Sequence, residues 1–433
     1  MIDMDIHKKN IHFIGCNGAS MKGLMRIVEA RGAKVSGSDL ALGGHSAKNI
    51  GNNIELVVFS GAVGEDNVEL IEAKRRKISC IERGEFLGQL CKSFDKVIAV
   101  AGTHGKTTTS AMLGGVMREA TLHFGGQFST LNFQRSIEDI DGIRLGGDTL
   151  ITEACEFRRS MLYIKEAVAI ITNVDFDHPD CYRDRGEYFK AFKKFAKQSL
   201  AVIICGDDRR TRGLVRNKVV ITFGFEEGND YRAVNITESD NGVEFDVVTQ
   251  YGGVGRIKLN VPGRHNALNA LCAVVTALNF GLEFDEVAGR LENFLGVKRR
   301  MELIGDLDGR EVWLDYAHHP KEIECALSAV GGRKTTVVFQ PHTYSRLRSL
   351  WEEFGEVLNN KAGHADISRV IVLPVYAARE KALKGVGGRE FAEQSGFYYA
   401  DSFKRARAYL KTECDQDEII LLLGAGDIDK VII

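Results

Sequence analysis

The residues best suited to chemistry lie at positions 97–110, VIAVAGTHGKTTTS. An apolar run is followed by glycines, a lysine and three threonines, the order of a strand, a phosphate loop and a helix. Glycines let backbone amides approach a polyphosphate, the lysine contacts the β and γ phosphates, and a threonine hydroxyl ligates magnesium. The loop is a shortened variant, because Val100 stands where the full pattern has another glycine. The sequence therefore predicts an ATP site at Gly102, Thr103, His104, Gly105, Lys106, Thr107 and Thr108.

Two later segments place metal-ligand residue types directly after apolar, strand-like runs. Residues 149–152 lead into Glu153, and residues 167–172 lead into a polar segment that contains His178. In open parallel sheets, ligands bind beyond the carboxyl ends of the strands, so both side chains are expected near Lys106. We predict that Glu153 and His178 hold cations there. The alternatives are a surface glutamate and a histidine in a turn.

A second group of reactive residue types follows two strand-like runs near the end of the chain. One segment, 315–320, reads DYAHHP, and the other, 340–346, reads QPHTYSR. Two adjacent histidines are more often part of a packed turn than of a site. Because Asp, Tyr, His and Arg gather at two strand ends of one predicted sheet, we favour a functional role for both segments.

The chain begins with another nucleotide-loop pattern. Residues 11–16 form a strand-like run, and the following residues 17–23 open an apolar helix pattern. The pair Gly15 and Gly18 is weak evidence for a dinucleotide, although Asp39 is compatible with NAD. Since the chain already has a separate ATP loop, we expect this first loop to contact the diphosphate of a nucleotide-linked substrate.

The length of 433 residues and the alternation of strand and helix patterns predict an α/β protein of three domains. Residues 1–95 are expected to form an N-terminal Rossmann-like domain. Residues 96–297 are expected to form a central P-loop ATPase-like parallel-sheet domain, to which period-two residues 231–261 add an antiparallel sheet. Residues 298–433 are expected to form a C-terminal Rossmann-like domain. The expected strands of the first domain are 11–16, 33–35 and 55–59, and those of the third are 311–314, 335–339, 370–373 and 419–423.

Net charge, cysteine pattern and apolar segments indicate which partners and which cellular compartment to expect. The net charge is −2, with 57 basic and 59 acidic residues interspersed, so we expect small-molecule partners and no nucleic acid. Nine scattered cysteines, never in CxxC spacing, favour reduced thiols over a disulfide framework or a structural zinc. No signal-peptide pattern and no apolar run long enough for a membrane span is present. We therefore expect a cytoplasmic protein without membrane insertion.

These motifs together resemble the Mur ligase family, and within it the branch that adds L-alanine. The quoted text comes from all three predicted domains and is much more specific in combination than any single motif. It comprises GCNGASMKG (15–23), GSDL (37–40), AVAGTHGKTTTS (99–110), EACEFRR (153–159), TNVDFDHPD (172–180), GRHNALNA (263–270), GVKRRME (296–302), LDYAHHP (314–320), FQPHTYSR (339–346), LPVYAARE (373–380) and LGAGDI (423–428).

The resemblance implies an ATP-dependent ligase that joins L-alanine to the lactyl carboxylate of UDP-N-acetylmuramate through an acyl phosphate, in peptidoglycan precursor synthesis. The first domain would bind the UDP-sugar, the second ATP, and the third the amino acid. The third domain would close over the second, with a hinge near 296–298. ATP and Mg²⁺ are the implied cofactors. A monomer or weak homodimer is expected.

The resemblance also implies roles for individual residues. Lys106, His318 and Arg346 would be catalytic, and His318 and Arg346 would also bind the amino acid. Asn266, Arg300 and Asp315 would join the phosphate loop in binding ATP, and Thr107 would join Glu153 and His178 in holding Mg²⁺. The UDP-sugar would contact Gly15, Gly18, Ser20, Met21, His45 and Tyr316.

The chain differs locally from the family pattern. Its first loop carries Cys16, Asn17 and Ser20, and the segments from Asp39 to His45, 120–126 and 329–334 are shorter than usual for the family. Lys193 lies near the place of a carbamylated lysine in other branches and stays unassigned. Two alternatives remain open: a ligase that attaches a murein tripeptide during recycling, and a nucleotide-binding regulator that has lost turnover.

Overall fold

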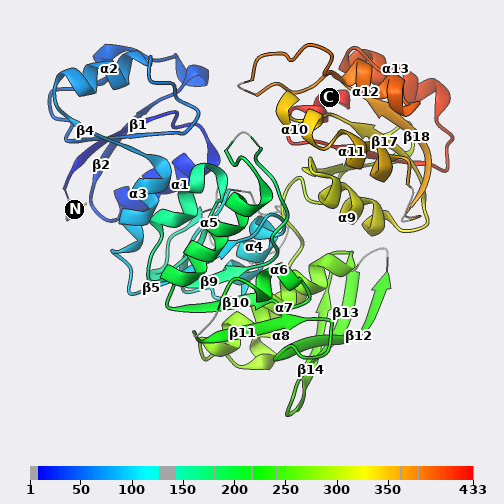
Figure 1. The fold of residues 1–433 in the computed structure, drawn as a ribbon, viewed down its shortest axis with the longest axis horizontal. Coiled ribbons are helices and arrows are strands. Elements are labelled where there is room, and N and C mark those ends of the chain that lie inside the picture. Colours follow the sequence, from blue (N-terminus) through cyan, green and yellow to red (C-terminus); the bar gives the residue numbers. More distant parts are fainter. Residues whose placement is uncertain are drawn as a thin grey trace.

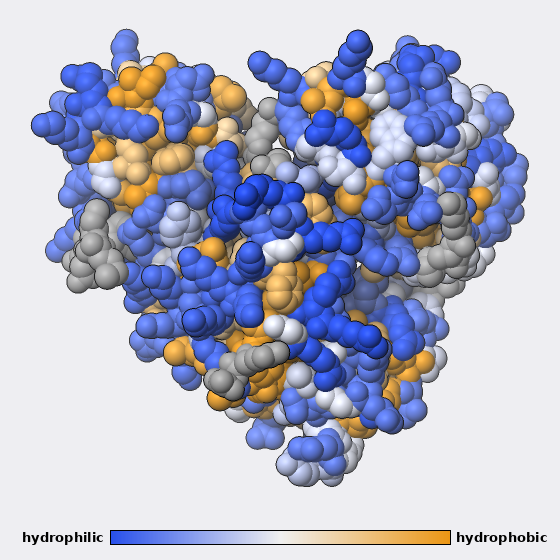
Figure 2. Space-filling view, viewed as in Figure 1, coloured by the Kyte–Doolittle hydropathy of each residue, from blue (hydrophilic) through white to orange (hydrophobic). Residues whose placement is uncertain are grey.

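Three β-sheets organise the chain in the computed structural model, which describes residues 8–125, 143–179, 181–215, 218–239, 242–360, 363, 365–378 and 380–432. The first and third domains lie side by side above the central domain in the view of Figure 1. Figure 2 shows a notch between these two upper domains. Three residues of the segments quoted above, Gly126, Asp180 and Arg379, lie outside the described residues. No helix in the described ranges is long and apolar enough to cross a membrane.

The first sheet has four parallel strands in the order β2-β1-β3-β4. Its apolar strand residues pack under the helices, as the residue pattern predicts. The fourth strand was missed because its sequence, SCIE, is short and only half apolar. The elements are β1 (Asn10–Ile14), α1 (Ala19–Ala30), β2 (Lys34–Ser38), η1 (Leu40–Leu42), η2 (Ala47–Asn49), β3 (Leu56–Phe59), α2 (Val68–Arg75), β4 (Ser79–Glu82) and α3 (Arg83–Cys91).

The central sheet has ten strands in the order β14-β13-β12-β11-β10-β9-β5-β8-β6-β7. The antiparallel strands β12 to β14 continue the parallel sheet, because β12 pairs in parallel with β11 before the hairpins begin. The strands are β5 (Lys96–Ala101), β6 (Ala120–His123), β7 (Ile143–Arg144), β8 (Gly147–Glu153), β9 (Val168–Ile171), β10 (Ala201–Cys205), β11 (Val220–Gly224), β12 (Tyr231–Ser239), β13 (Gly242–Thr249) and β14 (Gly252–Leu259). The helices are α4 (Lys106–Val116), η3 (Phe157–Tyr163), α5 (Arg185–Gln198), α6 (Arg209–Arg212), α7 (Arg264–Asn279) and α8 (Phe284–Glu292).

The third sheet has six strands in the order β15-β16-β20-β17-β18-β19, with β15 antiparallel to β16. The four expected strands are present, and the two edge strands, β15 and β19, were missed because acidic residues and a glycine interrupt the first and the second is very short. The strands are β15 (Glu302–Leu307), β16 (Arg310–Asp315), β17 (Lys334–Phe339), β18 (Asp366–Val372), β19 (Tyr398–Tyr399) and β20 (Ile419–Leu423). The helices are α9 (Pro320–Val330), α10 (Tyr344–Ser349), α11 (Trp351–Leu358), α12 (Gly388–Ser395), α13 (Phe403–Glu413) and η4 (Ile428–Val431).

Two kinds of interface join the domains. The first domain packs α3 so closely on η3 that a Cβ on Gly88 would lie 2.4 Å from the carbonyl oxygen of Tyr163. The third domain contacts the central one through charged side chains described below. The proposed domain limits, 95 and 297, fall in the connections between α3 and β5 and between α8 and β15.

Candidate active site between the central and third domains

The predicted phosphate loop joins β5 to the first turn of α4. Gly102 and Gly105 have φ angles of 140° and 81°, a region that favours glycine. A Cβ on Gly102 would lie 2.0 Å from Oγ1 of Thr172, so the close packing of the loop also requires glycine there. The amide of His104 donates to Oδ1 of Asn173 at 2.9 Å, which fixes the loop to the end of β9.

Lys106, at the start of α4, faces the protein's own oxygens. Its Nζ donates to the carbonyl oxygens of Gly102 and Thr103 and, at 3.1 Å, to Oε1 of Glu156. Burial alone would lower the pKa of Lys106, but Glu156, Cys155 and Glu153 together raise it, Glu156 foremost. The ammonium group is therefore charged and held where the loop would present a phosphate.

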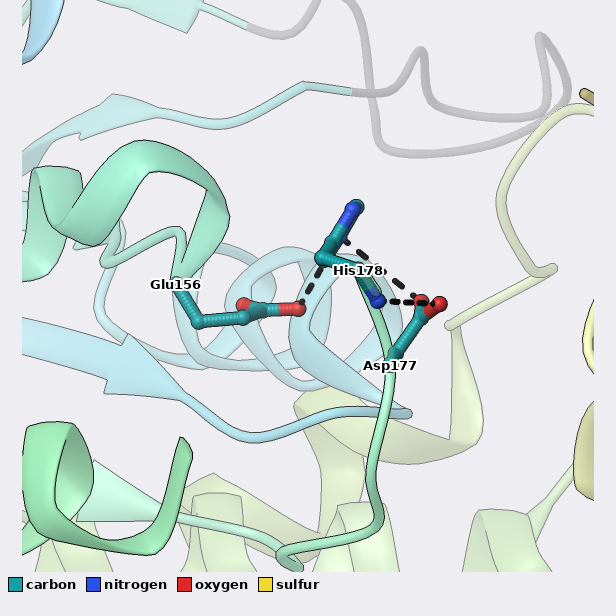
Figure 3. Close-up of side chains that lie close together, drawn as sticks. All are labelled: Glu156, Asp177 and His178. Atoms are coloured by element: carbon teal, nitrogen blue, oxygen red, sulfur yellow. Dashed lines mark hydrogen bonds and ion pairs between the residues drawn. The ribbon is translucent and has the colours of Figure 1, made fainter. Parts of the chain in front are cut away.

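A carboxylate–imidazole–carboxylate cluster lies beside this lysine (Figure 3). Nε2 of His178 is 3.6 Å from Oε1 of Glu156 and 3.7 Å from Oδ2 of Asp177. His178 has a φ of 56°, which turns the chain so that neighbouring residues 177 and 178 both face Glu156. Burial alone would lower the pKa of His178, but the carboxylates, Asp177 foremost, raise it. Sequence reasoning found His178 and missed Glu156 and Asp177, although both stand in the segments it singled out.

Glu153 ends β8 and is not part of this cluster. Its Oε1 is buried and has no hydrogen-bond partner among the described residues. Its charge is felt at both Lys106 and Arg300. A buried carboxylate oxygen without a donor suits a hard divalent cation, so the residues present fit the implied magnesium.

A pocket of about 700 Å³ lies between the phosphate loop and the third domain. Such a volume is typical of a site for a small ligand. Of the residues predicted to bind ATP, those that line it are His104, Gly105, Thr107, Thr108, Asn266, Arg300 and Asp315. The structure thus brings residues from two domains to one pocket, as predicted, whereas Gly102, Thr103 and Lys106 do not line it.

Asp315, at the end of β16, fixes the backbone where the chain enters the third domain. Its carboxylate accepts hydrogen bonds from the amides of Met301 at 2.8 Å and Ala317 at 2.7 Å. Burial raises the pKa of Asp315 to about 6, although Arg300 and the two amides act in the opposite direction. Asp315 therefore shapes the wall of the pocket that carries Arg300.

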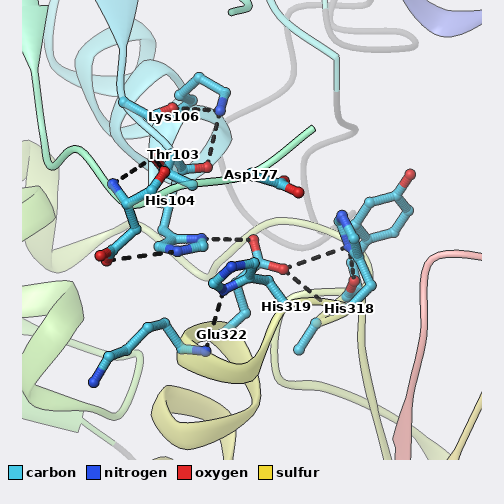
Figure 4. A network of polar contacts seen from close by, with 12 residues as sticks. Thr103, His104, Lys106, Asp177, His318, His319 and Glu322 are labelled. Atoms are coloured by element: carbon cyan, nitrogen blue, oxygen red, sulfur yellow. Dashed lines mark hydrogen bonds and ion pairs between the residues drawn. The ribbon is translucent and has the colours of Figure 1, made fainter. Parts of the chain in front are cut away.

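Glu322 on α9 connects the two domains and was not predicted (Figure 4). Its Oε1 is 3.4 Å from Nδ1 of His104 and 3.7 Å from Nη1 of Arg300, and its Oε2 is 3.4 Å from Nδ1 of His318. Burial would raise the pKa of Glu322, but these cationic and imidazole partners hold it well below its usual range. The signal available in the sequence was the spacing of His318 and Glu322, four residues apart at a helix start.

Tyr316 and His318 lie together on the third domain's side. The Tyr316 ring packs against the His318 ring, with centroids 5.3 Å apart, and beneath the guanidinium of Arg300. His318 Nδ1 is 2.9 Å from the carbonyl oxygen of Tyr316, so Nδ1 carries the proton. Burial lowers the pKa of His318 to about 4. The neutral ring therefore presents Nε2 as an acceptor.

Arg346 binds a carboxylate, but this carboxylate belongs to the protein. Its Nε donates to Oδ1 of Asp177 at 3.0 Å and its Nη2 to Oδ2 at 3.2 Å, a bidentate pair across the domain interface. Both side chains are buried. Burial would raise the pKa of Asp177, but Arg346 keeps it well below its usual range. Arg346, which the sequence predicts to bind the amino acid, thus has the geometry to bind a carboxylate.

The residues predicted for the UDP-sugar lie in the first domain, except Tyr316, which lies in the third. Gly15 and Gly18 flank the turn into α1, and Ser20 hydrogen-bonds through Oγ to Nε2 of His123 at 3.2 Å in the central domain. Met21 is 2% exposed and packs in the core, so only its backbone can meet a ligand. His45 follows η1 and is described below. Lys193 is exposed on α5 and does not line the pocket.

Comparison with known proteins identifies the family. Residues 10–95, 100–277 and 299–426 match the models named Mur ligase family, catalytic domain; Mur ligase middle domain; and Mur ligase, glutamate ligase domain. A UDP-N-acetylmuramate--L-alanine ligase from Clostridium acetobutylicum is 37% identical over 99% of this chain and 97% of its own length. The chain belongs to the Mur ligase family. The predicted resemblance is confirmed.

Other Mur ligases agree in sequence and fold. The ligase of the same name from Carboxydothermus hydrogenoformans is 36% identical over 97% of this chain and 95% of its own length. The crystal structure of UDP-N-acetylmuramate-alanine ligase from Thermotoga maritima superposes with a TM-score of 0.78 at 27% identity, over 98% of this chain and 97% of that one. A murein peptide ligase from Psychrobacter arcticus, 22% identical over 98% and 97% of the two chains, has a TM-score of 0.72 and shares the fold. The predicted three-domain α/β architecture is confirmed.

Proposed function

We propose that this protein is an ATP-dependent ligase that joins L-alanine to the lactyl carboxylate of UDP-N-acetylmuramate. The observation that carries the proposal is the pocket shared by the phosphate loop and the third domain, together with Lys106 next to that loop and the bidentate Arg346 at the interface of the same two domains. Relatives named for this activity, 36 to 37% identical over nearly the whole chain, support it. We expect the protein to act in peptidoglycan precursor synthesis, in the cytoplasm, as a monomer or weak homodimer.

The proposed chemistry has two steps. A lactyl carboxylate oxygen attacks the γ phosphorus of ATP, and ADP leaves. The amine of L-alanine then attacks the acyl carbon, and the tetrahedral intermediate expels phosphate. Lys106 would exchange Glu156 for the γ-phosphoryl oxygens, on which charge develops, and a preorganised donor of this kind contributes about 2.7–4 kcal/mol.

The amino-acid side of the reaction belongs to the third domain. Arg346 would take the carboxylate of L-alanine in the bidentate manner that it now uses for Asp177. His318 would receive a proton or hydrogen bond from the amine through Nε2, since its Nδ1 proton is held by Tyr316. Asn266, Arg300 and Asp315 would surround the nucleotide.

Magnesium is also a proposal. Thr107, Glu153 and His178 would hold it, with Glu156 and Asp177 close to His178. When bound, Mg²⁺ would neutralise charge on the phosphates. Glu153→Gln should raise the magnesium concentration required for half-maximal phosphate release, whereas Glu283→Gln on an exposed helix start should not. An unchanged magnesium requirement in Glu153→Gln would contradict this assignment.

The deciding experiment measures phosphate release while ATP, UDP-N-acetylmuramate and L-alanine are omitted in turn. We expect release only when all three are present. ATP binding without alanine-dependent release would favour the regulator. Product masses from parallel incubations with L-alanine and with a murein tripeptide would separate the alanine ligase from the recycling ligase.

A further inference from the structure

A buried carboxylate in the first domain has no part in the chemistry above. Glu69, in the first turn of α2, is fully buried. It accepts hydrogen bonds from Ser38 Oγ at 2.5 Å, the Ser46 amide at 3.0 Å, Asn49 Nδ2 at 2.6 Å and His12 Nε2 at 3.2 Å. Burial would raise the pKa of Glu69, but these four hydrogen bonds together lower it. Such a fully satisfied carboxylate fixes the groups around it.

Ser38 transmits this fixed geometry to His45. The serine hydroxyl has one hydrogen, and because an ionised carboxylate can only accept, that hydrogen points to Glu69. Ser38 Oγ is also 3.1 Å from Nδ1 of His45 and must accept there. His45 therefore carries a proton on Nδ1, and in the neutral ring Nε2 is an acceptor.

His45 lies where a ligand of the first sheet is expected. It follows β2, past Gly43 and Gly44 with φ angles of 98° and 83°. The loop after β2 is tied to the loop after β1, because the amide of Asn17 donates to Oδ2 of Asp39 at 3.1 Å. Both loops leave the carboxyl ends of parallel strands, the edge at which such sheets bind ligands. The side chain of His45 is 15% exposed, so one face remains accessible.

We infer that Glu69 and Ser38 are positioning residues that hold His45 with Nε2 as a hydrogen-bond acceptor for a hydroxyl or N–H group of the UDP-sugar. In this orientation an Nε2 without a proton selects a hydrogen-bond donor on the substrate and does not bind a phosphate oxygen. The inference rests on the proposed function for the identity of the substrate. The proton position on His45 is independent of it.

A matched pair of serine variants tests the relay. Ser38→Ala removes the hydroxyl between Glu69 and His45, whereas Ser36→Ala removes a hydroxyl on the same strand whose one hydrogen bond among the described residues is to His12. Ser38→Ala should raise the KM for UDP-N-acetylmuramate about tenfold, the effect of losing one well-placed hydrogen bond, with kcat and the KM values for ATP and L-alanine within about twofold. Ser38→Thr, which keeps the hydroxyl, should restore the KM, and Ser36→Ala should leave it unchanged.

Two further measurements separate positioning from folding. In a His45→Ala background, Ser38→Ala should add no further increase in KM, because its effect passes through His45. Histidine side-chain ¹⁵N spectra of the ligand-free protein, with the His45 signal assigned by its loss in His45→Ala, should show the proton on Nδ1 in the wild type and a changed tautomer in Ser38→Ala. A wild-type proton on Nε2, or equal effects of Ser36→Ala and Ser38→Ala, would overturn the inference. Failure of the proposed function would instead appear as missing phosphate release in the wild type, with the ¹⁵N spectra unaffected.

Discussion

The first-domain site and the interface between the central and third domains handle buried charge in different ways. Around Glu69, each hydrogen bond of the carboxylate is made to a neutral group of the same domain. In the site between the central and third domains, Lys106 is paired with Glu156 within the central domain, and Arg346 with Asp177 across the interface. The first arrangement is preorganised and can remain when substrate binds. In the second arrangement, Lys106 and Arg346 are paired with carboxylates of the protein, and they must exchange these partners when phosphate and amino acid bind. Substrate binding there is therefore coupled to rearrangement.

The largest effect is expected from removing the lysine of the phosphate loop. Lys106→Ala should reduce turnover by roughly 10² or more, because the transition-state charge on the γ-phosphoryl group loses its donor. Phosphate release and thermal melting should be measured together, with Lys194→Ala on the exposed face of α5 as the control. Undiminished phosphate release in Lys106→Ala would contradict the assignment of the ATP site.

A smaller and more selective effect is expected at Arg346. Arg346→Lys keeps the charge but loses the planar bidentate fork, so the KM for L-alanine should rise by about 10-fold or more, from an expected loss of roughly 1.5–3 kcal/mol. The KM for ATP should change little. Arg348→Lys, on the exposed side of the same helix α10, is the matched control. An equal rise in the KM values for ATP and L-alanine would indicate general disruption of the interface.

Stability should depend on pH through buried neutral histidines, two of which, His318 and His319, lie at the third-domain interface. Burial lowers the pKa of His123, His265, His318 and His319 to about 4. Between about pH 6.5 and pH 4 the unfolded chain therefore binds more protons than the folded one, and stability falls as pH falls. Asp315, whose pKa is raised to about 6, opposes this trend in the same range.

Denaturant titrations between pH 7 and pH 5 measure this balance. Four histidines outweigh one carboxyl, so unfolding at pH 5 should take up at least about two protons. A free energy of unfolding that is constant from pH 7 to pH 5 would show that these rings are not buried as neutral groups.

The sequence predicted the parts of the site that are local and missed those that depend on tertiary packing. The phosphate loop is continuous in the chain, so Gly102 to Thr108 and the following helix could be recognised from spacing alone. The carboxylates that pair with the cations of the site are far apart in the sequence: Glu156 and Asp177 follow two separate strands, and Glu322 lies on a helix of another domain. Neither residue periodicity nor a sequence motif predicts which carboxylate pairs with which cation. Met21 shows a second limit, because the side chain of a residue within a recognised loop motif can lie in the core.

The smallest expected effect is a change in the radius of gyration of the protein. It tests whether the third domain moves while the first domain stays fixed on the central one. The first-to-central contact at Gly88 leaves no space for movement, whereas the third domain is held by ion pairs. The predicted hinge at 296–298 includes Val297, which is 2% exposed and packs in the central core. The connection continues into the third domain through Arg299 and Met301, which have φ angles of 60° and 47°.

Small-angle scattering should therefore show that the ligand-free protein expands in Asp177→Asn, which loses the bidentate pair, and that an ATP analogue with UDP-N-acetylmuramate restores compact dimensions. Closure matters because an acyl phosphate exposed to water would hydrolyse before the amine arrives. Arg348→Lys serves again as the control, since it alters the same helix without touching the pair. If Asp177→Asn and the wild type have the same radius of gyration with and without both ligands bound, the third domain does not move, and the ion pairs at the interface exchange partners by side-chain rotation alone.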